Sequence, residues 1–216
     1  MSTERRTGSV RESPRIRGAE RADAEPMREI YNEAVQTTTA TFDTEPRSLE
    51  EQLAWLDRHD TRHPVLVAEQ GPTVVGWASL SPWSERGAYD GTAETSIYVG
   101  SRWRGRGVGR ALLGELLSAA SRSHLHTVLA RIALGNPVSR ALHVTSGFRS
   151  VGVMHEVGYK FGRFLDVELL ECRIGPPADL PTMATAPEKA SPDVRRRPRS
   201  GASLTSEAFE PGASRE

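Results

Sequence analysis

The most constraining feature of this chain is a segment rich in glycine and arginine that lies between a β-rich stretch and an amphipathic helical stretch. Glycines let the backbone turn tightly and leave its amides uncovered. A helix that begins directly after such a turn directs free N–H groups and a positive dipole end toward one point. The segment therefore predicts a phosphate-binding loop, formed by Arg104, Gly105, Arg106, Gly107, Val108, Gly109 and Arg110.

Two nucleotide-binding motifs do not fit this segment. A P-loop ends in Gly-Lys-Ser/Thr, which this segment lacks. The dinucleotide fingerprint Gly-x-Gly-x-x-Gly requires a third glycine where this chain has Arg110. A glycine-rich turn with solvated arginines is the structural alternative, and the local pattern alone leaves it open.

Composition narrows the class of protein. Of the 216 residues, 28 are Lys or Arg and 28 are Asp or Glu, so no net charge favours nucleic acid, and we expect none to bind. No run approaches the roughly 18 apolar residues of a membrane helix. The N-terminus lacks an apolar signal region, and the single Cys172 cannot form an internal disulfide. We expect a soluble, cytoplasmic protein that does not bind membranes.

Three segments are expected along the chain. Residues 175–216 hold half of the 14 prolines and a basic cluster at 195–199, a composition that predicts a disordered Pro/Arg/Ser-rich tail. Residues 1–14 are expected to be a disordered extension. Residues 15–174 form one domain, long enough to bury about two thirds of its unfolded surface.

Helices are predicted from apolar periodicity and capping residues. Asp23 is expected to cap the first helix. Ser48 and Glu51 form the capping box of the second, whose expected apolar stripe is Leu49, Leu53, Trp55 and Leu56. A third helix follows the glycine-rich segment, and a fourth runs from Pro137 to about Ser146.

Strands are predicted from β-rich runs with a period of two. We expect them near Ile16 and over residues 65–69, 73–81, 92–99, 127–134, 149–157 and 163–173. In the fourth of these, Glu94, Ser96 and Tyr98 share one face, which places a carboxylate in mid-strand. The order of elements predicts a mixed α/β (α+β) fold whose N-terminal part is antiparallel.

With these elements in place, the sequence resembles the GNAT-type N-acetyltransferases. Their acetyl-CoA pyrophosphate loop reads Arg/Gln-x-x-Gly-x-Gly/Ala after a β-strand, as residues 104–109 do, and Asn136 and the helix ending in Gly147-Phe148 also match. The resemblance implies a mixed central sheet of about six to seven strands flanked by about four helices. It also implies acetyl-CoA as cosubstrate and no metal.

A narrower resemblance is to the phosphinothricin and methionine sulfoximine N-acetyltransferases, whose activity is linked to herbicide resistance. It depends on five blocks, at residues 41–46, 82–83, 86–89, 92–99 and 158–167. This resemblance implies acetylation of the α-amine of a small amino-acid analogue, Glu94 as the general base, and a homodimer. We expect burial in the strand to raise the pKa of Glu94. A carboxylate paired with a structural arginine is the alternative.

The resemblance also assigns the coenzyme arm. The backbone of Ile97, Tyr98 and Val99 would pair with pantetheine, and an N–H near Val99 would stabilise the oxyanion. Asn136 and Ser139 would bind its amides, although Asn136 equally suits the N-cap of the helix that begins at Pro137. His143 stands where many relatives have a tyrosine that protonates the thiolate, and it either does so or only contacts CoA.

At the acceptor, Arg86 is expected to bind the carboxylate and Tyr89 to shape the pocket. Phe42 and Trp83 would supply apolar walls. The resemblance also implies that Lys160 and Phe161 approach the acceptor across a dimer interface.

Other functions stay open. The acceptor could be a polyamine, an aminoglycoside or a protein N-terminus. A non-catalytic module that binds acyl-CoA or RNA would use the same arginine-rich loop and predicts salt-sensitive binding.

Overall fold

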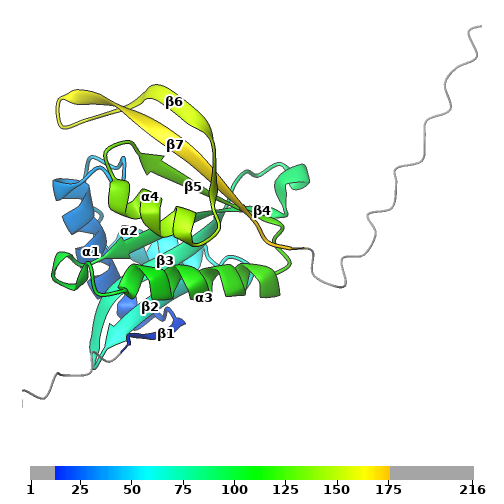
Figure 1. The fold of residues 1–216 in the computed structure, drawn as a ribbon. Coiled ribbons are helices and arrows are strands. Elements are labelled where there is room, and N and C mark those ends of the chain that lie inside the picture. The colour runs from blue at the N-terminus through cyan, green and yellow to red at the C-terminus, as the bar shows by residue number, and fades with distance from the viewer. Residues whose placement is uncertain (1–12, 176–216) are drawn as a thin grey trace, which may run out of the picture. The chain divides into compact units, whose positions relative to one another are not determined.

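The computed structural model describes residues 13–175, and the expected disordered segments lie almost wholly outside this range. The described part is a seven-stranded mixed sheet with four α-helices, which confirms the expected fold class (Figure 1). The strands are β1 Arg15–Gly18, β2 Val65–Gln70, β3 Thr73–Pro82, β4 Thr92–Val99, β5 Thr127–Ala133, β6 Arg149–Lys160 and β7 Arg163–Arg173. The α-helices are α1 Ala24–Thr37, α2 Leu49–Asp57, α3 Val108–Arg122 and α4 Pro137–Thr145, and the 3-10 turns are η1 Arg21–Asp23, η2 Gly87–Tyr89 and η3 Ser101–Trp103.

The strands run in the order β1-β2-β3-β4-β5-β7-β6. Every neighbouring pair is antiparallel except β4 and β5, which are parallel. That parallel pairing covers only Thr92–Glu94 against Thr127–Leu129. Both strands continue beyond it, so the sheet opens between them toward their C-terminal ends.

Two hydrophobic clusters hold the helices to the sheet. In one, the fully buried Leu112, Leu113 and Leu116 of α3 join alanines, valines and leucines of β3, β4 and β5. In the other, Met27 and Tyr31 of α1 pack with Trp77 of β3, whose Nε1 donates to the Met27 carbonyl over 3.0 Å. This packing fixes the strands on both sides of the opening.

Two sequence-based predictions about helix α1 and helix α2 need correction. Asp23 does occupy the N-cap of α1, but its carboxylate binds Arg17 and the Glu20 amide instead of capping that helix. Leu49 is 42% exposed, its neighbours Glu50 and Glu51 are exposed as well, and the fully buried residue of that helix is Gln52. The capping box of Ser48 and Glu51 is confirmed.

The C-terminal hairpin is longer than expected. Strand β6 continues to Lys160, three residues beyond the predicted end, and pairs with β7 to the last residue before the turn. Register shifts after Ser150 and Met154 interrupt the pairing. Most side chains of β6, the edge strand, are exposed.

No helix within residues 13–175 is both long enough and apolar enough to cross a membrane.

Candidate active site

A cleft of about 1420 Å³ lies where β4 and β5 diverge. Its walls come from residues 37–43 after α1, residues 94–99 of β4, residues 130–133 of β5, and the beginnings of α3 and α4. Pockets for one small ligand usually measure about 300 to 1000 Å³. The cleft is therefore large enough for two ligands that meet at the opening of the sheet.

The backbone of β4 presents free groups to this opening. Gly100 N donates to Val75 O over 3.1 Å, and antiparallel strands exchange bonds at every second residue pair. The even-numbered residues of β4 therefore bond to β3. The N–H and C=O groups of Ile97 and the N–H of Val99 point the other way, where β5 has already diverged.

The glycine-rich turn has the predicted geometry. Gly105 and Gly107 have φ values of 71° and 85°, a region that other residues rarely adopt. Helix α3 starts directly after Gly107, and the Ala111 amide is the first to bond back, to the Gly107 carbonyl. The amides of residues 108–110 therefore have no partner within the helix and lie in the cleft wall, as an anion site requires.

The arginines of this turn are not all directed to the cleft. The Arg104 guanidinium donates from Nε to Val99 O over 3.0 Å and lies 3.7 Å from Glu33. Arg106 stacks 5.0 Å from the ring centroid of Trp103. Arg110 lines the cleft. The backbone, more than the arginine side chains, forms the candidate anion site.

Glu94 stands at the point of divergence, as the last residue of β4 paired with β5. Arg131 of β5 donates to its two carboxylate oxygens, from Nε over 2.6 Å and from Nη2 over 2.7 Å. The Glu94 side chain is 19% exposed and that of Arg131 is 53% exposed. This bond raises the pKa of the Arg131 guanidinium. The ion-pair alternative for Glu94 is therefore present, and the pair itself lines the cleft.

His143 lines the cleft from α4 and is almost fully buried. Burial lowers its pKa, and its Nδ1 lies 2.8 Å from the Ser139 carbonyl. A carbonyl can only accept, so Nδ1 carries the hydrogen and, in the neutral ring, Nε2 is an acceptor. The Phe148 ring packs edge-on against the imidazole at 5.0 Å.

Asn136 caps α4, because its Oδ1 accepts from the Ser139 amide over 3.1 Å. The cap uses only the carbonyl oxygen of the side chain, and the Nδ2 group has two further hydrogens. Both residues line the cleft. Capping and a contact to a ligand are thus compatible at Asn136.

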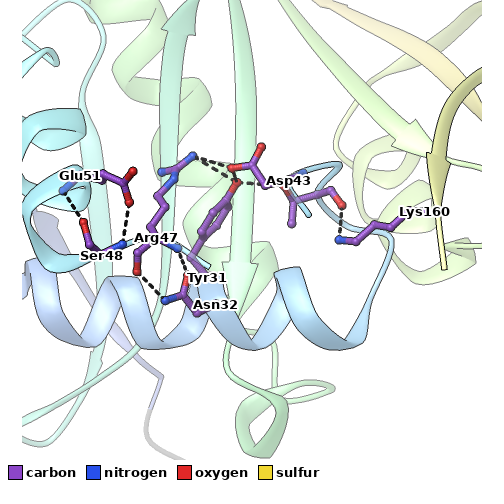
Figure 2. A network of polar contacts seen from close by, with 8 residues as sticks. Tyr31, Asn32, Asp43, Arg47, Ser48, Glu51 and Lys160 are labelled. Atoms are coloured by element: carbon purple, nitrogen blue, oxygen red, sulfur yellow. Dashed lines mark hydrogen bonds and ion pairs between the residues drawn. The ribbon is translucent and has the colours of Figure 1, made fainter. Parts of the chain in front are cut away.

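The loop after α1 is held by a polar network (Figure 2). The Tyr31 hydroxyl donates to Asp43 over 2.5 Å, and burial raises the pKa of Tyr31 to about 12. The Arg47 guanidinium lies over the Tyr31 ring at 4.0 Å. From the tip of the β6–β7 hairpin, the buried Lys160 donates to the Thr41 carbonyl over 2.8 Å.

Two of the aromatic residues expected at the acceptor, Phe42 and Phe161, are neighbours in sequence of this network and line the cleft. Phe42 lines the cleft and packs against Gly158 of β6, where an added Cβ would lie 2.0 Å from its ring. Phe161 also lines the cleft, from a hairpin turn in which its φ is 51°. Trp83 lies 5.8 Å from the Arg131 guanidinium.

Trp83 and three other residues expected at the acceptor do not line the cleft. Arg86 and Tyr89 are exposed at η2, and the side chain of Lys160 is bound to the loop. Arg131 was not singled out from the sequence. This arginine lies two residues after Leu129, the residue of β5 that pairs with Glu94. Its significance depends on which strand lies beside β4, and no local pattern specifies that.

Comparisons with known proteins agree with this geometry. A family model described as Acetyltransferase (GNAT) family matches residues 27–148. The L-methionine sulfoximine/L-methionine sulfone acetyltransferase of Pseudomonas aeruginosa is 39% identical over 171 residues, which cover 78% of this chain and 99% of that protein. A phosphinothricin acetyltransferase from Sinorhizobium meliloti, solved in complex with AcCoA, has a TM-score of 0.75 and 33% identity, and the match covers 82% of this chain and 98% of the other.

A third protein carries a different name. The ribosomal-protein-alanine N-acetyltransferase from Brucella melitensis has a TM-score of 0.72 and 40% identity, and the match covers 74% of this chain and 99% of the other. The family match and these near full-length similarities show that the chain belongs to the acetyltransferase (GNAT) family.

Proposed function

We propose that this protein transfers the acetyl group of acetyl-CoA to the α-amine of a small amino-acid analogue, of the phosphinothricin or methionine sulfoximine type. The observation that carries the proposal is the position of Glu94 at the opening of the sheet, in the same cleft as the candidate anion site, Phe42 and Phe161. The relatives named for these two acceptors support the choice of acceptor.

The chain offers a continuous set of groups for acetyl-CoA. The free amides of residues 108–110, beside Gly105 and Gly107, suit the pyrophosphate. The backbone N–H and C=O of Ile97 suit the pantetheine amides, since these groups face the opening. The Val99 carbonyl accepts from Arg104, and its N–H is left for the oxyanion. The backbone of Tyr98 faces β3, so Tyr98 is better suited to support this strand than to pair with the coenzyme. Asn136 Nδ2 and the Ser139 hydroxyl complete the set.

Glu94 acts as the base in this proposal. Its carboxylate takes one proton from the acceptor ammonium, which leaves a neutral amine to attack the thioester carbon. The Val99 N–H donates to the oxyanion that forms. When the C–S bond breaks, the second amine proton passes to the thiolate, so that the amide and CoA leave neutral at the reacting atoms. Glu94 then returns its proton to solvent.

His143 contacts the coenzyme in this proposal instead of supplying that proton. Its lowered pKa and its Nδ1–H tautomer leave Nε2 as an acceptor near pH 7. The imidazole therefore suits a ligand N–H or S–H donor better than it suits a thiolate.

Phe42 and Phe161 form the apolar walls for the acceptor side chain. We also propose a homodimer. The edge strand β6 exposes Val151, Val153 and Val157, and apolar edges of this kind are usually covered. Arg86, Tyr89 and Lys160 lie outside the cleft wall of one chain, so a direct role at the acceptor requires a second copy.

A protein N-terminus is the second candidate acceptor, because one similar structure is named for ribosomal-protein alanine. The test is CoA release from acetyl-CoA with methionine sulfoximine, phosphinothricin, ordinary amino acids, spermidine and an alanine-ended peptide. Glu94→Gln is compared with wild type. Turnover of the amino-acid analogues that falls at least about 100-fold in Glu94→Gln supports acceptor and base together. Turnover only of the peptide keeps the enzyme class and moves the acceptor.

A further inference from the structure

The ion pair of Glu94 and Arg131 leaves part of the arginine free. Nε and Nη2 each donate one hydrogen to Glu94. A guanidinium has five N–H donors, so two hydrogens on Nη1 and one on Nη2 are not used by this contact. Arg131 is 53% exposed, and both residues line the cleft. The outer edge of Arg131 is therefore a forked donor directly beside the proposed base.

We propose that this outer edge binds the α-carboxylate of the acceptor while Glu94 takes the proton of its ammonium, so that Arg131 determines specificity for α-amino acids. The inference rests on the proposed function and refines it. In an α-amino acid the ammonium nitrogen and a carboxylate oxygen are three bonds apart, so its two charges are neighbours. A glutamate and an arginine held side by side present the complementary pair of charges.

The four charges alternate when both are in place. Guanidinium, Glu94 carboxylate, ammonium and acceptor carboxylate form a ring, and each charge has two neighbours of opposite sign. Charge-assisted hydrogen bonds of this kind are about twice as strong as neutral ones. Arg131 keeps its protons throughout, because Glu94 raises the pKa of the guanidinium. Only Glu94 exchanges a proton during the reaction.

The guanidinium is oriented before any acceptor arrives. Glu94 holds its inner edge in a two-bond contact, and the Trp83 ring lies 5.8 Å from it. The neighbouring Ala130 and Ile132 are buried, so β5 is a firmly packed support. A preorganised donor loses little entropy on binding. Arg86, the arginine expected for this role, is exposed near η2 and outside the cleft wall.

The inference makes a specific claim about poor acceptors. An amine with no carboxylate beside it leaves the outer edge of Arg131 without an anion. Spermidine and amino-acid amides should therefore react slowly with the wild-type enzyme.

The test compares L-methionine sulfone with its carboxamide, which keeps the amine and the side chain but lacks the charge. The kcat/KM ratio of acid to amide is measured for wild type, Arg131→Gln, Arg131→Lys, Arg86→Gln and Arg149→Gln. Arg149 is the matched control, since it also holds a glutamate, Glu171, in a surface ion pair on the sheet but lies outside the cleft wall. Differences in amine basicity between the two acceptors cancel when this ratio is compared across variants.

Arg131→Gln should lower the ratio about 10- to 100-fold, the loss expected for a hydrogen bond between charged groups. Its rate with the carboxamide should also fall, because Arg131 holds the carboxylate of Glu94, but by less than its rate with the acid. Arg131→Lys should be intermediate, and Arg149→Gln should match wild type. Acetyl-CoA binding and the melting temperature confirm that each variant is folded.

An unchanged acid-to-amide ratio in Arg131→Gln would overturn the inference while the proposed function stands. If both rates fall equally, Arg131 is only a positioning residue for Glu94. If neither rate falls and Arg86→Gln loses the preference instead, Arg86 binds the carboxylate. If wild type acetylates no amino acid at all, the proposed function fails first, and the inference fails with it.

Discussion

Gly158→Ala should disturb the acceptor pocket through a single contact. An added Cβ would lie 2.0 and 2.4 Å from two ring carbons of Phe42, far inside contact distance. Either β6 shifts or the ring turns away. Phe42 is only 38% exposed, so turning the ring out loses more than half of its coverage. Overpacking of this kind costs about 1 to 3 kcal/mol.

The cost of turning the Phe42 ring out is an upper limit on the loss of stability, and it is of similar size. About 100 Å² of aromatic surface is exposed again, which at roughly 25 cal/mol per Å² costs about 2.5 kcal/mol. We therefore expect Gly158→Ala to lower the free energy of unfolding by about 1 to 2.5 kcal/mol. It should also raise the KM for the amino-acid acceptor several fold. The KM for acetyl-CoA should change little, because neither Gly158 nor Phe42 is among the groups assigned to the coenzyme.

A double-mutant cycle isolates this contact. Urea unfolding is measured for Gly158→Ala, Phe42→Ala and the double variant. In the Phe42→Ala background the ring is gone, so Gly158→Ala should cost no more than about 0.5 kcal/mol. An equal cost in both backgrounds would refute the assigned contact and place the strain in the backbone of β6.

Four further variants test the stability of the fold. Gly107→Ala should lower the free energy of unfolding by about 1 to 2 kcal/mol, because the φ of Gly107 is 85°. It should also weaken acetyl-CoA binding, which calorimetry measures. Gly114→Ala, within α3 and facing open space, should gain about 0.5 to 1 kcal/mol, and equal stability of the two variants would argue against the turn geometry. Arg17→Met should cost about 3 kcal/mol in urea unfolding at pH 7, since it strands the buried Asp23. Arg17 lowers the pKa of Asp23 below its ordinary 3.8, so this stabilisation is complete above that pH and disappears as pH falls further; a variant that keeps the wild-type acid slope would contradict it. His143 has a pKa lowered from 6.5 by burial, so stability should fall as pH drops below 6.5, and urea midpoints of His143→Gln should show a shallower decline.

Much of the fold follows from local patterns in the sequence. The capping box at Ser48, the proline after Asn136 and the strand at residues 92–99 were all predicted at or close to their observed positions. These features depend on residues close together in the chain. The exposed Leu49 shows the limit of local patterns. Helical periodicity predicts which face of a helix is apolar, but not which of its turns is covered by the rest of the protein.

The candidate site likewise has parts that the sequence predicts and parts that it does not. The glycine-rich turn is a contiguous motif, and a tight turn there could be predicted from sequence; the structure shows that Gly105 and Gly107 make it with positive φ. The partner of Glu94 could not, since Arg131 lies 37 residues away on a strand whose pairing is parallel and short. Lys160 and Thr41, 119 residues apart, meet only because the long β6–β7 hairpin reaches the loop after α1. Tertiary pairing, which no local pattern encodes, determined these contacts.

The most direct test of the proposed function is to incubate the full-length protein with acetyl-CoA and methionine sulfoximine, follow CoA thiol release, and identify the product by mass spectrometry. Our proposal predicts stoichiometric CoA release with the acetyl group on the α-nitrogen, and near-complete loss of both signals in Glu94→Gln. Acetylation at another atom, or full activity in Glu94→Gln, would contradict it.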